Sequence, residues 1–262
     1  MSTVKVNNTI VGIIGGMSYH STATYYNRIN EGIGKALPFK YGRHSAKILI
    51  YSLDMEEHNE LVWNDKYKEN DELMLQSVKK LKNGGADFYI FACNTVHDSL
   101  PYIEEYIPYS VFPCLHIADC CALKLKENKI SCVGLIGTRI TMQHDFYIKR
   151  LQLHGIKVVV PKLTKDQMEI QRIILKELCA GIFDNQQSKN FLLNTIIRQD
   201  LCMNQGAQAC ILGCTEFELI IKPDTVKDIP LFDSAQVHID AIIQVLLKQK
   251  KLTDFLPNFS KL

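Results

Sequence analysis

Two segments of the sequence occur twice in the same order. Residues 11–29 (VGIIGGMSYHSTATYYNRI) align with residues 133–151 (VGLIGTRITMQHDFYIKRL) at an offset of 122. Residues 83–93 (NGGADFYIFAC) align with residues 204–214 (NQGAQACILGC) at an offset of 121. One such match could arise by chance, but two in the same order at nearly the same spacing favour an internal duplication. We therefore expect two halves with the same fold.

Each half alternates short apolar segments with longer amphipathic ones. We predict strands over residues 10–14, 47–52, 88–92 and 111–115 in the first half and over 131–136, 157–160, 209–213 and 229–232 in the second. Helical periodicity separates them; for example, one helix face carries Ile170, Ile173, Ile174, Leu178 and Ile182. Buried strands that alternate with helices are typical of parallel sheets covered on both faces. The sequence predicts the α/β class, with two similar doubly wound domains related by a pseudo-twofold axis.

The expected domain boundary lies between the two copies. We expect a first domain over residues 1–118 and a second over 119–234, with a helix at about 235–247. That helix opens a C-terminal segment, residues 235–262, which is expected to pack back on the first domain. Because no linker rich in Pro, Gly or Ser separates the halves, we expect them to pack closely, with the active site in the cleft between them.

Composition argues against several classes of function. A formal charge of +2 and 22% charged residues do not suggest a nucleic-acid or anionic-membrane partner. The apolar runs are shorter than the roughly 18 residues that a membrane span needs, and the N-terminus lacks the pattern of a signal peptide. The nine cysteines include no Cys-x-x-Cys pair, so neither a zinc site nor a disulfide framework is expected. We expect a cytoplasmic protein with free thiols and no metal.

Cys93 and Cys214 occupy the same position of the repeated segment, at the end of a predicted strand. Polar residues follow each of them, in CNTVH (93–97) and CTEFE (214–218). Ligands of open α/β sheets bind beyond the carboxyl ends of the strands, and a helix that starts there offers backbone N–H groups and a partial positive charge. Such a site can bind a carboxylate and lower the pKa of a thiol. Alternatively, both cysteines are small side chains that fill the core.

The residues next to these cysteines suit a carboxylate ligand. Asn94, Thr95 and Thr215 can donate hydrogen bonds to it or cap the helices that follow. If the two halves face each other, one thiolate can remove a proton from a carbon while the opposite thiol returns another to its other face. A duplicated chain supplies the symmetry that a racemase needs.

An ordered set of motifs resembles the aspartate/glutamate racemase family over nearly the whole chain. The motifs are GIIGGMS (12–18), ACNTVH (92–97), LHIAD (115–119), GLIGTRITMQHDFY (134–147) and GCTE (213–216). Several of them are most similar to the bacterial subgroup of broad-specificity amino-acid racemases. The resemblance implies two α/β domains, no cofactor, an amino-acid substrate and a homodimer. It also implies Cys93 and Cys214 as the acid/base pair, with Met17, Asn94, Thr95, Thr215 and Glu216 lining the substrate site.

Two departures from the family pattern concern the side chain of the substrate. Aspartate-specific relatives are expected to carry an arginine after the second strand and a lysine in the second half. Here residues 54–63 (DMEEHNELVW) contain no arginine, and Cys179 stands at the position of the lysine. Without these cations a side-chain carboxylate loses charged hydrogen bonds, so aspartate specificity is in doubt. Lys47 or Arg139 could take over the role, although either is equally well a surface charge.

Other readings of the sequence stay open. The alternatives are a related isomerase, a hydantoin racemase or a decarboxylase, or a non-catalytic amino-acid-binding module. GIIGG differs from the Gly-x-Gly-x-x-Gly pattern, so we expect a tight strand-to-helix turn there rather than a dinucleotide site. His97, His116, His144 and His238 show no metal spacing; we interpret them as polar helix or loop residues, with at most one near the pocket. We also expect Cys93 or Cys214 to react first with alkylating agents.

Overall fold

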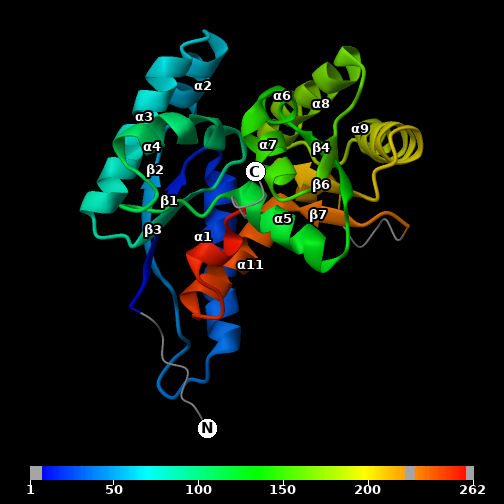
Figure 1. Ribbon diagram of the computed structural model, residues 1–262. Helices are drawn as coiled ribbons and strands as arrows, with labels where there is room; N and C mark the ends of the chain where they lie inside the picture. Colours follow the sequence, from blue (N-terminus) through cyan, green and yellow to red (C-terminus); the bar gives the residue numbers. More distant parts are fainter. Residues whose placement is uncertain (1–7, 222–227, 258–262) are drawn as a thin grey trace. The chain divides into compact units, whose positions relative to one another are not determined.

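The structure is a computed structural model that describes residues 8–221 and 228–257 (Figure 1). The described chain divides into two units. The first contains residues up to His116 together with His238–Leu256, and the second contains Ile117–Val237 without the undescribed stretch, and Pro257. The boundary thus lies two residues before the expected one at 118, and the C-terminal segment joins the first unit at His238 rather than at residue 235. Residues 258–262 of that expected segment lie outside the described chain.

The first unit contains a three-stranded parallel sheet in the order β2-β1-β3. Its elements are β1 (Ile10–Gly15), α1 (Tyr19–Ala36), β2 (Lys47–Ser52), α2 (Met55–Trp63), α3 (Tyr67–Asn83), β3 (Phe88–Phe91), η1 (Thr95–Ser99), α4 (Leu100–Tyr106), the larger part of α11 (Ser234–Leu246) and η5 (Leu252–Phe255).

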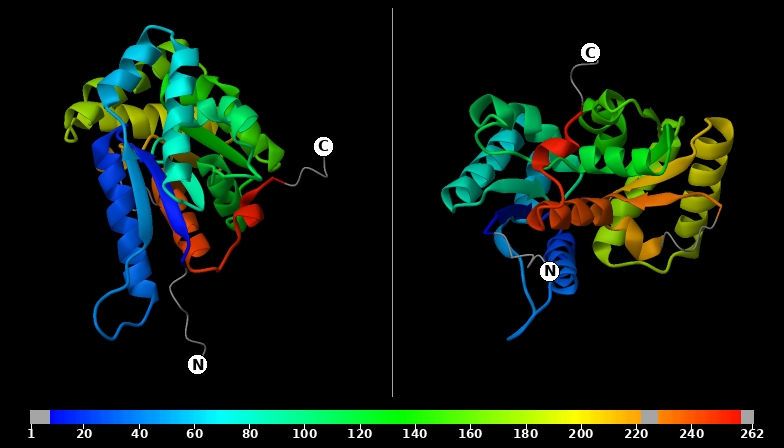
Figure 2. Two further views of the ribbon diagram at one scale, coloured as in Figure 1. Left: turned by 90° about the vertical axis from the view of Figure 1, so that its left-hand side faces the viewer. Right: turned by 60° about the horizontal axis from the view of Figure 1, so that its bottom comes forward.

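Helices cover both faces of this sheet. Ile14 and Phe91 pack on one face against α3 and α4, in a cluster that also holds Met74 and Ile103. On the other side of the sheet lies α1, as the left view of Figure 2 shows. A Cβ at Gly32 of α1 would collide with the side chain of Ile243, so α1 and α11 pack closely.

The second unit contains a four-stranded parallel sheet in the order β5-β4-β6-β7. Its elements are α5 (Ile117–Glu127), β4 (Cys132–Gly137), α6 (Arg139–Gln143), α7 (Asp145–Leu153), β5 (Lys157–Val159), α8 (Thr164–Lys176), the short helix η2 (Leu178–Ala180), α9 (Gln186–Asn190), the π-helix η3 (Phe191–Asn204), β6 (Ala209–Gly213), α10 (Phe217–Ile220), β7 (Leu231–Asp233) and the start of α11. Alternate residues of β6 face opposite sides: Cys210 and Leu212 pack against α8, η3 and α10, and Ala209 and Ile211 pack against α5 and α7.

The duplication extends to the register of the strands. Val11 pairs with Phe88 in the first sheet, and the equivalent Val133 pairs with Ala209 in the second. The hydrogen bonds at the starts of β1 and β4 match as well. A side-chain oxygen of Asp87 accepts a hydrogen bond from the backbone of Ile10, and the side chain of Gln208 accepts one from the backbone of Cys132. Both sheets are parallel and covered by helices, which confirms the predicted α/β class.

Two predicted elements differ from the structure. Seven of the eight strands are present with ends within two residues of the prediction, but residues 111–115 form only an isolated bridge between Cys114 and Tyr89. Proline at position 113 has no N–H, which limits this segment as a strand. The helix face predicted over residues 170–182 is also too long. Helix α8 ends at Lys176, and Ile182 is exposed beyond Gly181, whose φ of +81° ends the following turn.

Membrane spanning was tested on the helices of residues 8–221 and 228–257. None of them combines the length and the apolar character that crossing a bilayer requires.

Candidate functional site

The first unit gathers four of the predicted site residues at the carboxyl edge of its sheet. Ile14 pairs with Phe91, and the Ala92 N–H donates to the Ile14 carbonyl at 2.9 Å, so the segments after β1 and β3 leave the sheet side by side. Met17 follows β1 and is buried, and Cys93 follows β3 and is half-buried. Both pack against the same apolar cluster. Asn94 and Thr95 continue from Cys93 into η1.

Gly16 and the start of α1 hold the segment that carries Met17. Gly16 has a φ of +94°, and a Cβ at this position would collide with the backbone of Leu53. Its N–H donates to Thr22 Oγ1 at 2.8 Å, and Ser18 Oγ caps α1. This is the tight strand-to-helix turn that the GIIGG pattern predicts.

The second unit places Cys214, Thr215 and Glu216 directly after β6. Cys214 Sγ donates to Glu216 Oε2 at 3.0 Å, and Thr215 Oγ1 donates to the same oxygen at 2.8 Å. All three residues are buried. The carboxylate of Glu216 therefore accepts a hydrogen bond from the thiol of Cys214, one of the two predicted catalytic residues.

The protonation of Cys214 differs from the expectation. Burial raises the pKa of the Cys214 thiol well above its usual range, and the charge and hydrogen bond of Glu216 raise it further. The sequence pattern predicted a lowered pKa for this thiol from the helix start. That effect is small here because α10 has only four residues and begins three residues after Cys214, at Phe217.

Two further titratable residues lie near Cys214. Cys179 in η2 is half-buried and packs against the apolar cluster that contains Cys214. Asp233 ends β7, the strand beside β6, and pairs with Leu212. Burial, together with the charge of Glu218, raises the pKa of Asp233 to about 7. Sequence reasoning did not select Asp233; the only signal was an acidic residue between a short apolar strand and a helix, which is also the pattern of a helix cap.

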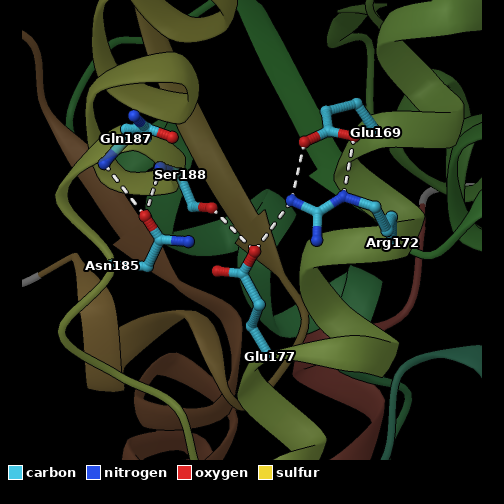
Figure 3. Close-up of polar contacts among 6 residues, drawn as sticks. All are labelled: Glu169, Arg172, Glu177, Asn185, Gln187 and Ser188. Atoms are coloured by element: carbon cyan, nitrogen blue, oxygen red, sulfur yellow. Dashed lines mark hydrogen bonds and ion pairs between the residues drawn. The ribbon is translucent and has the colours of Figure 1, made fainter.

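A polar network fixes the segment that carries Cys179 (Figure 3). Glu177 Oε1 accepts hydrogen bonds from Arg172 of α8 at 2.7 Å and from Ser188 Oγ of α9 at 2.9 Å. Arg172 also binds Glu169 with two hydrogen bonds, and Asn185 caps α9 by accepting from the backbone of Gln187 and Ser188. The buried Glu177 thus connects the two helices that flank η2.

The two alternative cations have different positions. Lys47 is exposed at the amino end of β2, where it binds Asn8, so it lies at the opposite edge of the sheet from Met17 and Cys93. This position argues against Lys47 as the partner of a substrate carboxylate. Arg139 lies at the start of α6, after the carboxyl end of β4, and its exposed side chain is on the same edge as Cys214.

Three of the four histidines considered in the sequence are buried close together. His97, His116 and His238 are all buried in the first unit, and the ring of His97 lies 4.4 Å from that of His116 and 6.1 Å from that of His238. Only His144 is partly exposed. His97 and His238 lie in the helices η1 and α11, and His116 and His144 lie in loops, which agrees with their interpretation as helix or loop residues. Among the described residues, no group of three or more His, Cys, Asp or Glu has the arrangement of a metal site.

Comparison with known proteins identifies relatives of the whole chain. Residues 14–242 match the family model described as Asp/Glu/hydantoin racemase. The chain is 36% identical to a candidate Asp/Glu racemase from Yersinia pestis, with a TM-score of 0.79 over 91% of this chain and 99% of that one. It is 31% identical to an aspartate racemase homologue from Pyrococcus horikoshii OT3, with a TM-score of 0.72 and the same coverage. The fold is also shared with a glutamate racemase from Francisella tularensis solved in complex with D-glutamate, at 16% identity, a TM-score of 0.58, and 97% and 84% coverage.

Proposed function

Because the chain belongs to the Asp/Glu/hydantoin racemase family, we propose that it is a cofactor-independent amino-acid racemase in which Cys93 and Cys214 exchange the Cα proton. The observation that carries this proposal is the repeated position of the two thiols. Cys93 follows β3, which pairs with β1, and Cys214 follows β6, which pairs with β4, so both lie at the carboxyl edge in the same register of the duplicated fold. A core-filling role does not explain why polar residues follow both cysteines.

The raised pKa of Cys214 supports one assignment of the roles in one direction. Cys214 is a thiol at neutral pH, so it is the general acid when Cys93, as thiolate, removes the Cα proton. In that step the proton passes from Cα to Cys93 Sγ, and the proton of Cys214 passes to the opposite face of the carbanion. In the reverse direction Cys214 must first pass its proton to Glu216 Oε2, 3.0 Å from Sγ, and the Cys93 thiolate must take up a proton from solvent. Cys214 is then the base and Cys93 the acid.

The residues around the thiols supply contacts for the substrate. In this proposal Asn94, Thr95 and Thr215 bind the α-carboxylate, while Met17 and Glu216 complete the site. An amino-acid ligand agrees with the D-glutamate complex of the glutamate racemase from Francisella tularensis, which has the same fold. The carboxylate of Glu216 also suits the α-ammonium group of the substrate, because opposite charges attract.

The missing cations support broad specificity. Helix α2 carries no arginine or lysine, and its His58 is buried against Asn70 with a Nδ1 to Oδ1 distance of 2.7 Å. Cys179 offers no positive charge in the position where a lysine is expected. Each missing charged hydrogen bond costs a substrate carboxylate about 1 to 3 kcal/mol. We therefore expect neutral side chains to be accepted at least as well as that of aspartate.

The test is proton NMR of Cα–H loss in heavy water with a panel of L-amino acids and a 5-substituted hydantoin. Wild type, Cys93→Ala and Cys214→Ala are compared with Cys132→Ala, a half-buried cysteine at the opposite end of β4. We expect exchange in the wild type and in Cys132→Ala, and no complete racemisation in the other two. Exchange of the hydantoin alone would assign the chain to hydantoin racemisation.

The same samples test the non-catalytic alternative. An amino acid that raises the melting temperature without any Cα exchange would show a binding module and contradict the enzyme. The homodimer implied by the resemblance stays a prediction, which sedimentation of the purified protein can check.

A further inference from the structure

A histidine outside the proposed substrate contacts binds the backbone of Cys93. His97 Nδ1 lies 3.0 Å from the carbonyl oxygen of Cys93 and 3.1 Å from that of Asn94. Carbonyl oxygens only accept hydrogen bonds, so Nδ1 must carry the proton and donate to both. The side chain of His97 has no exposed surface, which removes water as a competing partner.

The ring of His97 is held by its neighbours. Phe91 contacts it edge to face at a centroid distance of 5.2 Å, and the ring of His116 lies 4.4 Å away. Behind them, His238 accepts from Tyr25 OH at 3.0 Å through Nδ1 and donates to the Leu115 carbonyl at 2.9 Å through Nε2. These contacts leave the His97 ring little freedom to turn away from the two carbonyls.

Fixing these carbonyls fixes the orientation of the catalytic segment. The peptides after Cys93 and Asn94 are trans, so each N–H points opposite to its carbonyl. When His97 holds both carbonyls on its own side, the N–H groups of Asn94 and Thr95 point the other way, and the Cα–Cβ bond of Cys93 has one direction.

We propose that His97 is a positioning residue that orients the Cys93 thiol and the adjacent N–H groups through its Nδ1–H. This inference rests on the proposed function for its catalytic meaning, because it assigns His97 a part in the transfer of the Cα proton by Cys93. A reacting group that is slightly misplaced loses a large factor in rate. Removing the Nδ1–H of His97 should therefore change kcat more than KM.

Two amide substitutions of His97 distinguish the effect of its Nδ1–H donor from the effect of the rest of its ring. In His97→Asn the amide nitrogen can occupy the place of Nδ1, whereas in His97→Gln it reaches the place of Nε2. We expect His97→Asn to keep kcat within about threefold of wild type, and His97→Gln to lose about 10- to 100-fold in kcat with little change in KM. Equal kcat values in the two variants, whether high or low, would overturn the proposal.

Two measurements need no substrate and so keep this inference separate from the proposed function. The rate of Cys93 alkylation, with Cys132 as internal reference, should change in His97→Gln and stay near wild type in His97→Asn. In the wild type, ¹⁵N NMR of the imidazoles, assigned by the signal lost in His97→Asn, should show the Nδ1–H tautomer. An Nε2–H tautomer would overturn the proposal even if His97→Gln fails to fold. If no amino acid exchanges but both readouts behave as expected, the proposed function fails and the positioning of Cys93 stands.

Discussion

Cys214 and Glu216 form a hydrogen-bonded pair in which the Sγ–H donates to Oε2 across 3.0 Å. In the repeat, the position of Glu216 corresponds to that of Thr95, so the first unit has a hydroxyl where the second has a carboxylate. The duplicated backbone therefore presents its two thiols in different electrostatic surroundings. One thiol has a carboxylate that keeps it protonated, and the other has a neutral hydroxyl in the matching position, which suits a pair that starts with one acid and one base.

Replacing Glu216 by Gln should lower the pKa of Cys214, because the negative charge that stabilises the thiol over the thiolate is removed. At pH 8 the alkylation of Cys214, followed by mass spectrometry, should be faster than in the wild type. In the wild type Cys214 should react slowly. Glu218→Gln is the matched control, since Glu218 acts on Asp233 and should leave Cys214 unchanged. The same rate for Cys214 in both variants would contradict a role of Glu216 in its protonation.

A methyl group at Gly16 should disturb the segment of Met17. Gly16→Ala forces a positive φ on alanine and also directs a Cβ into the backbone of Leu53. Gly85→Ala, at a φ of +89° with open space around it, carries the first cost alone, about 1 kcal/mol. We expect Gly16→Ala to cost about 1 to 3 kcal/mol more in urea unfolding and to reduce turnover. Equal losses of stability would show that the close approach to Leu53 does not matter.

Asp119 anchors α5 to α7 by a buried ion cluster. Its carboxylate receives two hydrogen bonds from Arg150 Nε and a contact from His154 Nε2 at 2.9 Å, and its side chain is 2% exposed. Asp119→Asn leaves the arginine without its counterion and should cost about 3 kcal/mol in the free energy of unfolding. Asp145→Asn removes an exposed pair with Lys149 in α7 and should cost less than about 0.5 kcal/mol. A loss below 1 kcal/mol for Asp119→Asn would mean that the cluster contributes little.

The repeat made much of the fold predictable, because the hydrophobic pattern of a buried strand and the offset between copies are both local in sequence. It predicted β6 at its observed bounds, and it placed Cys93 and Cys214 at strand ends. The pKa of Cys214 could not be read in the same way. Its direction depends on burial and on how the Glu216 side chain turns back to the thiol, and neither follows from residue spacing.

The three buried histidines show the same limit. His97, His116 and His238 are separated in sequence by up to 141 positions, and only the return of α11 to the first unit brings His238 to the others. Periodicity places each on an element but does not tell which elements meet. The motifs therefore indicate the two cysteines but not the contact of the His97 ring with the carbonyls of Cys93 and Asn94.

His238 should make the stability of the protein depend on pH in the acid range. Burial lowers its pKa from 6.5 to about 4 in the folded protein, whereas in the unfolded chain the ordinary value returns. Above pH 6.5 the residue is neutral in both states and its contribution is constant. Between pH 6.5 and 4 the unfolded chain binds a proton that the folded protein does not, so stability falls as the pH falls, by about 3 kcal/mol at the lower limit.

The variant His238→Gln tests this pH dependence, because its amide keeps a donor for the Leu115 carbonyl but does not titrate. Burial also lowers the pKa of His58, and this second histidine is the same in the wild type and in the variant. Urea unfolding at pH 7, 6, 5 and 4.5 should therefore show a steeper loss for the wild type than for this variant. Parallel curves would mean that His238 is protonated as easily in the folded protein as in the unfolded chain.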